Sequence, residues 1–279
     1  SKSYNGKIDE NSNRKRMADW QDYYQADLNA ANIVDYTASE GDTIHAGDYV
    51  VVTTYRRGTG QVMSDGPFGG ASDPMYARPY VTNYFNQGGV DCIIQYWEDN
   101  LLNDEELVSL LKENSSSIFE DSIEASHTSA FWSYNLMEEL EQENYQYTDE
   151  FPIVMALGTN SFNDTALSEK ISQDYNNLLG ELYETVHAAP ISEWASTFNY
   201  TYRAQPYSLP GLDIAGASAT LDIPEGDNGT KGDGLRNLSA AVNLADKTYL
   251  SMEAVTGFGN LQINWADVAT EVTQNFSGG

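Results

Sequence analysis

An excess of negative charge is the feature of this sequence that most restricts what the chain can fold into. The 279 residues include 42 acidic and 14 basic side chains, which gives a formal net charge of −28 at pH 7. Self-repulsion of this size opposes a compact fold at low ionic strength, whereas the screening length falls to about 3 Å in 1 M salt. We therefore expect a protein of a salt-rich environment, with an ordinary acidic secreted protein as the alternative.

The apolar content predicts a folded chain. Hydrophobic residues make up 41% and aromatic residues 12% of the sequence, which excludes a disordered acidic tail. The length allows one large domain or two small ones. No run approaches 18 apolar residues, so we expect no membrane span. The single cysteine, Cys92, excludes an internal disulfide, and its apolar neighbours predict a position in the core.

The first 16 residues are basic, in contrast to the rest of the chain. A basic arm on an acidic body predicts an anionic partner such as nucleic acid, and a solvated terminus without a partner is the alternative. The chain begins without methionine and without a signal-peptide pattern, so we expect either a start removed by processing or a trimmed sequence. The five basic residues of this arm are Lys2, Lys7, Arg14, Lys15 and Arg16.

The first third of the chain predicts an extended arm followed by a long hairpin. Residues 1–40 are polar, and residues 49–55 are rich in β-branched side chains. Glycine and proline are then dense over residues 58–74, before two β-rich segments at 80–85 and 90–97. A two-stranded hairpin of this length cannot bury itself alone, so we expect it to pack on a neighbouring subunit.

Two helices are predicted in the middle of the chain. Asn103 with Glu106 forms a capping-box-like start for a long helix from about residue 104 to the low 130s, weakened at the serine run 115–117. Asn163 and Asp164 cap a second helix, which Pro190 ends.

Short strands are predicted elsewhere. They fall over residues 153–157, 247–255 and 259–268. No internal repeat is visible.

One carboxylate pair, Glu98 and Asp99, stands in a position that would suit catalysis. The pair follows the predicted strand that ends at Trp97, and barrel-type glycosidases place an acid at such a strand end. The favoured interpretation is a solvated loop before the next helix, whose amino terminus is stabilised by negative charge.

Other catalytic and ligand-binding patterns are missing from the sequence. There is no GxSxG, Walker or GxGxxG motif, and His45, His127 and His187 lack metal-ligand spacing. The polar loop 227–234 does not match an EF-hand and is interpreted as a surface turn. We therefore predict no catalytic residue, no metal and no cofactor.

The order of elements resembles the major capsid fold of tailed phages, which encapsulin shells share. The resemblance lies in a strand, residues 92–97, that leads through residues 98–103 into the start of a long helix. It implies an α+β fold with the tailed-phage capsid domains. These would be an N-terminal arm (1–40), an E-loop hairpin (41–97), a P domain with its spine helix (98–150), an A domain (151–258) and a C-terminal return to the P domain (259–279).

This resemblance implies a structural protein of a virion that infects a halophilic archaeon. Subunits would assemble into the hexamers and pentamers of an icosahedral capsid, with double-stranded DNA facing the arm and accessory capsid proteins as further partners. No lysine lies between Lys15 and Lys112, so non-covalent assembly is expected. The E-loop residues expected between subunits are Arg56, Arg57, Phe68, Tyr76 and Arg78.

Two alternatives stay open at this point. One is a secreted, extracellular glycoside hydrolase of barrel type, with Glu98 or Asp99 as the acid. It requires alternating strands and helices, and the sequence predicts only two clear helices. The other is a β-rich protein of an archaeal cell surface, which the N-x-S/T sequons would suit.

Overall fold

The computed structural model divides the chain into two compact units. The first comprises Ser1–Thr59 with Ser126–Tyr175, and the second comprises Gly60–Ala125 with Asn176–Gly279. The predicted arm, and the predicted hairpin up to residue 79, lie outside the residues that the structure describes. The described residues are 80–114, 116–123, 132–142, 145–157, 165–207, 212–227, 233–254 and 264–278.

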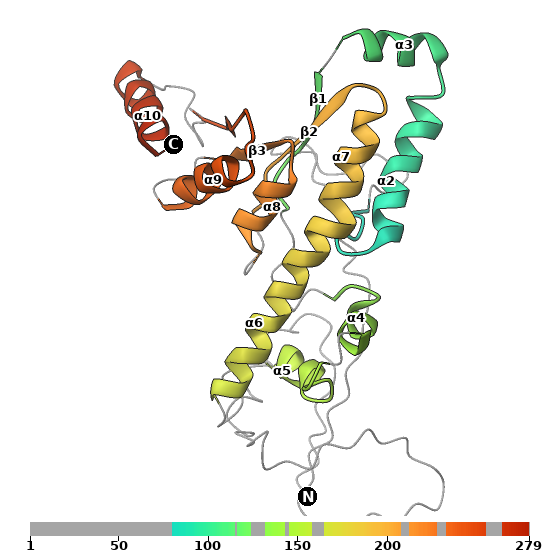
Figure 1. Ribbon diagram of the computed structural model, residues 1–279, viewed down its shortest axis with the longest axis vertical. Coiled ribbons are helices and arrows are strands. Elements are labelled where there is room, and N and C mark those ends of the chain that lie inside the picture. Colours follow the sequence, from blue (N-terminus) through green and yellow to red (C-terminus); the bar gives the residue numbers. More distant parts are fainter. Residues whose placement is uncertain are drawn as a thin grey trace, which may run out of the picture. The chain divides into compact units, whose positions relative to one another are not determined.

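The second unit contains a sheet of four parallel strands whose order in space is their order in the chain (Figure 1). Adjacent parallel strands need a crossover between them, and such crossovers are right-handed. Strands that advance in one direction therefore carry their helices on one face, as in a (β/α) barrel and unlike a doubly wound sheet. The strands are β1 (Ser116–Glu120), β2 (Tyr200–Ala204), β3 (Ile223–Gly226) and β4 (Ser251–Met252).

The later part of this unit alternates strand and helix. Helix α8 (Ile214–Thr220) joins β2 to β3, and α9 (Asp233–Leu244) joins β3 to β4. Both helices contact β3, and α10 (Trp265–Gly278) follows β4. A barrel-type fold requires this alternation of strands and helices. The sequence pattern did not predict it.

The predicted second helix is confirmed, but it extends further than expected. Helix α6 (Thr165–Leu182) continues through a π-helical turn, η3 (Tyr183–Ala188), into α7 (Ala189–Ser196). The prediction that Pro190 ends the helix is wrong. Pro190 lies in the first turn of α7, directly after the π-helical turn, and the helical backbone continues through it.

The predicted strand 90–97 is wrong, because this segment belongs to helix α2 (Gln87–Asn100). Its isoleucine and aromatic residues favour a strand, but its apolar positions 90, 93, 94 and 97 follow the period of a helix. Helix α2 packs against α7 and η3, and the Trp97 ring meets the Trp194 ring edge-on at 6.0 Å. Cys92 is exposed on this helix, which corrects its predicted core position.

The predicted helix from residue 104 to the low 130s is confirmed at its start and wrong in its continuation, because α3 ends at Glu113 and a strand follows. Helix α3 (Glu105–Glu113) is capped by Asp104, whose carboxylate accepts from the backbone N–H groups of Glu106 and Leu107. Ser116 and Ser117 then form part of β1. Serine hydroxyls compete for backbone hydrogen bonds in a helix, so a tertiary pairing with β2 prevails here.

Two further predicted strands are corrected. Residues 153–157 lie in helix α5 (Phe151–Leu157), where Phe151 and Val154 are buried one turn apart. Residues 265–268 of the predicted last strand lie in α10, where the Asn264 side chain accepts from the Asp267 N–H at the helix start. The predicted strand 247–255 is confirmed in part, since it contains β4.

The first unit is held by aromatic contacts. Helix α4 (Leu136–Gln142) buries Leu136 and Leu140. The Phe151 ring lies 5.8 to 6.0 Å from the rings of Trp132, Tyr145 and Tyr175.

Candidate functional site at the carboxyl edge of the sheet

All four strands end at the same edge of the sheet because they are parallel. Open parallel sheets and (β/α) barrels bind their ligands at this carboxyl edge. Polar side chains are concentrated here, at the last residues of the strands or directly after them. These residues, which we call the carboxyl-edge cluster, are Glu120, Asp121, Gln205, Tyr207, Glu225, Asp227 and Glu253.

Glu225 is the most buried carboxylate of the cluster, with 3% of its surface exposed. It accepts hydrogen bonds from Arg203 Nη1 at 2.6 Å, from Gln205 Nε2 at 3.0 Å and from the Ser251 hydroxyl. The Arg203 guanidinium also lies 4.4 Å from the centre of the Phe119 ring. These hydrogen bonds offset the free-energy cost of burying the negative charge of Glu225.

Gln205 connects two strands of the cluster. Its side-chain Nε2 donates to Glu225 Oε1 at 3.0 Å and to Glu253 Oε2 at 2.8 Å. The Glu253 backbone N–H donates to the Gly226 carbonyl at 2.7 Å, which fixes the start of this segment against β3. Glu253 is only half-buried, so its carboxylate is both positioned and accessible.

Tyr207 brings an unpaired hydroxyl into the cluster. The residue is 6% exposed, and its buried hydroxyl has no hydrogen-bond partner among the described residues. Burial raises the pKa of Tyr207, and the charges of Asp227, Glu253, Glu225 and Asp121 raise this pKa further. The hydroxyl therefore stays neutral, and a buried donor left unpaired costs about 1–3 kcal/mol.

The cluster is strongly acidic. It contains five carboxylates, and the one guanidinium bonded to the cluster among the described residues, that of Arg203, is paired with Glu225. Over the described ranges, no three His, Cys, Asp or Glu side chains are arranged to hold a metal ion. The arrangement therefore suits a ligand that donates hydrogen bonds to carboxylates.

A second buried constellation lies at the end of β1. His187 is fully buried in η3, and its Nε2 lies 2.9 and 3.0 Å from the two carboxylate oxygens of Glu120. The Tyr202 hydroxyl is 3.4 Å from the same nitrogen, and the Tyr84 and Tyr183 rings contact the imidazole. Because no ligand can reach His187, its role is to fix Glu120 rather than to touch a substrate.

Tyrosine ionisation is suppressed around this constellation. Burial raises the pKa of Tyr84 to about 12, and the charge of Glu120 contributes. The pKa values of Tyr183 and Tyr202 are also raised, first by burial and then by Glu120. These hydroxyls are hydrogen-bond donors at neutral pH.

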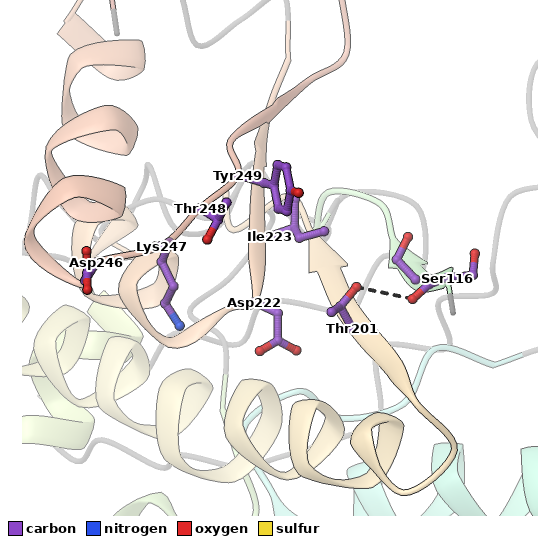
Figure 2. Close-up of a pocket in the computed structure, with 9 residues that line it drawn as sticks. Ser116, Thr201, Asp222, Ile223, Asp246, Lys247, Thr248 and Tyr249 are labelled. Carbon is purple, nitrogen blue, oxygen red and sulfur yellow. Dashed lines mark hydrogen bonds between the residues drawn. The ribbon is translucent and has the colours of Figure 1, made fainter. Parts of the chain in front are cut away.

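An open pocket of about 530 Å³ lies at the opposite, amino edge of the sheet (Figure 2). Its lining includes Ser116, Thr201, Asp222 and Lys247. Asp222 is engaged in the fold, because it accepts from the Ser192 hydroxyl at 2.7 Å and from the Tyr202 N–H at 2.8 Å. The amino edge of such sheets contributes to stability rather than to catalysis, so the carboxyl edge is the better candidate.

The structure separates Glu98 and Asp99 from the carboxyl-edge cluster. They lie exposed in the last turn of α2 and not after a strand, so the premise of the predicted acid is wrong. Glu98 accepts a hydrogen bond from Trp194 Nε1 at 3.2 Å. Of the polar loop 227–234, Asp227 lies at the carboxyl edge, and residues 228–232 lie outside the described ranges.

The residues predicted for DNA and for subunit contacts lie outside the described part of the chain. This applies to the arm and to the E-loop set, so both stay predictions. These residues are Lys2, Lys7, Arg14, Lys15 and Arg16 of the arm, and Arg56, Arg57, Phe68, Tyr76 and Arg78 of the E-loop. No helix within the described ranges is long and apolar enough to span a membrane.

Comparison with known proteins yields a likeness in fold alone. No family model matches the chain, and no curated protein matches its sequence. Among solved structures, the chain is similar to a rhamnosidase from Novosphingobium sp. PP1Y, with a TM-score of 0.53 and 16% sequence identity. The match covers 71% of this chain and 20% of the rhamnosidase, so the chain spans only a small part of that protein's length.

Proposed function

We propose that this chain is part of a glycoside hydrolase whose catalytic groups are at the carboxyl edge of its parallel sheet. The observation that carries the proposal is that Asp121, directly after β1, and Glu253, directly after β4, lie at the carboxyl edge of the sheet together with the buried Tyr207 hydroxyl, which has no hydrogen-bond partner among the described residues. Glycosidases act with two carboxyl groups that flank the scissile bond. The sequential strand order and the likeness in fold to part of a rhamnosidase support the same class of protein.

Each carboxylate has a role that follows from its surroundings. Glu253 is the general acid, since it is accessible and is oriented by one hydrogen bond from Gln205. It protonates the glycosidic oxygen as the bond from that oxygen to the anomeric carbon breaks. Asp121 is exposed and receives the proton of the water that adds to the anomeric carbon.

Glu225 acts through its neighbours. It accepts from both Arg203 and Gln205, and so holds the amide that orients Glu253. Its negative charge also stabilises the positive charge that develops on the sugar ring in the transition state.

The hydrolase was the alternative to the capsid subunit that the sequence favoured. The proposed acid is now Glu253, not Glu98 or Asp99. The test is hydrolysis of a panel of aryl glycosides that includes an α-rhamnoside, measured in high salt. Glu253→Gln and Asp121→Asn should each lower kcat about 100-fold or more, because each removes a proton-transfer group.

Glu98→Gln is the matched control, since it makes the same substitution at an exposed glutamate on a helix. It should leave kcat unchanged. Loss of activity in Glu98→Gln together with full activity in Glu253→Gln would refute the assignment and restore the residue first suggested by the sequence.

A self-assembling shell subunit is the second candidate function. The observation that favours it is a set of apolar side chains on α10 that are exposed in the single chain. Trp265 has 86% and Phe276 has 89% of its surface exposed. Size-exclusion chromatography in 3 M salt separates the candidates. A megadalton particle supports the shell subunit, a monomer supports the hydrolase, and a sheet-forming aggregate supports a cell-surface protein.

A further inference from the structure

The unpaired hydroxyl of Tyr207 and the charge of the cluster around it together restrict the ligand. Gln205 uses both hydrogens of its amide to bind Glu225 and Glu253, so it has none left for a ligand. Arg203, which is outside the cluster as defined, is engaged by Glu225 through Nη1 and by the Phe119 ring, and its buried Nε has no hydrogen-bond partner among the described residues. Within the described residues of the cluster, the Tyr207 hydroxyl is the donor that has no partner.

The remaining groups at this edge accept hydrogen bonds. Ionised carboxylates have no hydrogen to donate, and Asp121, Asp227 and Glu253 lie at the same edge of the sheet, where their charges raise the pKa of Tyr207. A ligand that fits must offer several hydroxyl donors to the carboxylates and one acceptor oxygen to the phenol. A sugar with free hydroxyls has this pattern, whereas a uronate, sulfate or phosphate group would meet like charge.

We infer that the site binds a neutral, polyhydroxylated sugar and that Tyr207 donates its hydroxyl hydrogen to one oxygen of that sugar. This inference rests on the proposed function and adds the class of substrate and one residue that determines it. The Tyr207 hydroxyl is a buried donor without a partner in the free protein. A ligand whose oxygen accepts from it therefore binds more tightly than a ligand that lacks this acceptor.

Tyr207→Phe is the variant that tests the contact. It removes only an oxygen atom that makes no hydrogen bond in the free protein, so Tm should be unchanged or higher. The value of kcat/KM for the best neutral aryl glycoside should fall about 10- to 100-fold. Tyr249→Phe, which removes an exposed hydroxyl from the pocket at the opposite edge, should leave both quantities unchanged.

A structural role for the hydroxyl predicts the reverse pattern. Tyr207→Phe would then lower Tm, and activity would fall only in proportion to the folded fraction. That outcome overturns the inference, and so does an unchanged kcat/KM in Tyr207→Phe. In either case, glycosidase activity of the wild-type protein would still support the proposed function.

The charge of the substrate is tested on the wild-type protein. Neutral aryl glycosides should be cleaved at least 10-fold faster than an aryl glucuronide of the same leaving group, and faster cleavage of the glucuronide overturns the inference. If no aryl glycoside is cleaved, the proposed function fails, and isothermal titration with methyl rhamnoside, methyl glucoside and glucuronate decides the inference separately. The inference is supported if the neutral sugars bind and if Tyr207→Phe weakens this binding 10-fold. It is overturned if no sugar binds or if glucuronate binds more tightly.

Discussion

At the scale of single residues, the protein depends on polar side chains that are buried with specific partners. Glu225 is only 3% exposed and is bonded to Arg203 and Ser251, from other strands of the sheet, and to Gln205, directly after β2. His187 is fully enclosed and bonded to Glu120 from a strand 67 residues earlier in the chain. Such partners are distant in sequence, so these residues give no local signal of their role.

The tyrosines around His187 make stability sensitive to alkaline pH. Tyr84 has its pKa raised to about 12 by burial and by Glu120, from an unfolded value near 10. The folded state therefore binds the Tyr84 proton more strongly, and this stabilisation is complete below pH 10 and is lost as the pH rises from about 10 to 12. Tyr84→Phe should lose less stability than the wild type over this range.

The measurement is the free energy of unfolding in urea at pH 9, 10, 11 and 12 for both proteins. Phenylalanine keeps the ring contact with His187, so the comparison isolates the hydroxyl. Parallel pH profiles would show that Tyr84 does not titrate with folding.

At the scale of elements, packing decided the secondary structure wherever the local signal was divided. Residues 90–97 carry both β-favouring side chains and a helical apolar period, and contact with α7 and η3 selects the helix. Helix-forming residues precede Ser116 and Ser117, yet these two serines pair with β2. Helix α6 was predictable because its long apolar stripe has only one interpretation.

The start of α2 gives a test of this packing. A Cβ atom added at Gly89 would lie 1.9 Å from the Asn83 backbone oxygen, whereas one added at Gly88 would lie 3.1 Å from the Asn86 side-chain oxygen. Gly89→Ala should therefore destabilise the protein by about 1–3 kcal/mol. Gly88→Ala should be neutral or slightly stabilising, because alanine favours a helix.

Urea unfolding of the two variants in the same salt is the measurement. Equal stabilities would mean that the turn before α2 adapts to an added methyl group, contrary to the close approach of the Asn83 carbonyl.

At the scale of the whole molecule, the net charge of −28 is the dominant property. The free energy of unfolding should rise steadily from 0.1 M to 3 M KCl, because salt screens the repulsion that the folded state concentrates. Denaturant midpoints measured along this series check the prediction. A midpoint that is independent of salt would show that repulsion does not limit the stability of this fold.

The sequence by itself determined the acidic character, the presence of a folded core and helix α6, because each is a local or summed property of the chain. It also placed β4 within a predicted strand. Only the tertiary structure decided that four strands run parallel in chain order, and therefore that Asp121, Gln205, Tyr207 and Glu253 share one edge. The physical reason is that strand direction and order are set by contacts between residues far apart in the chain, and no local pattern records which strand ends meet.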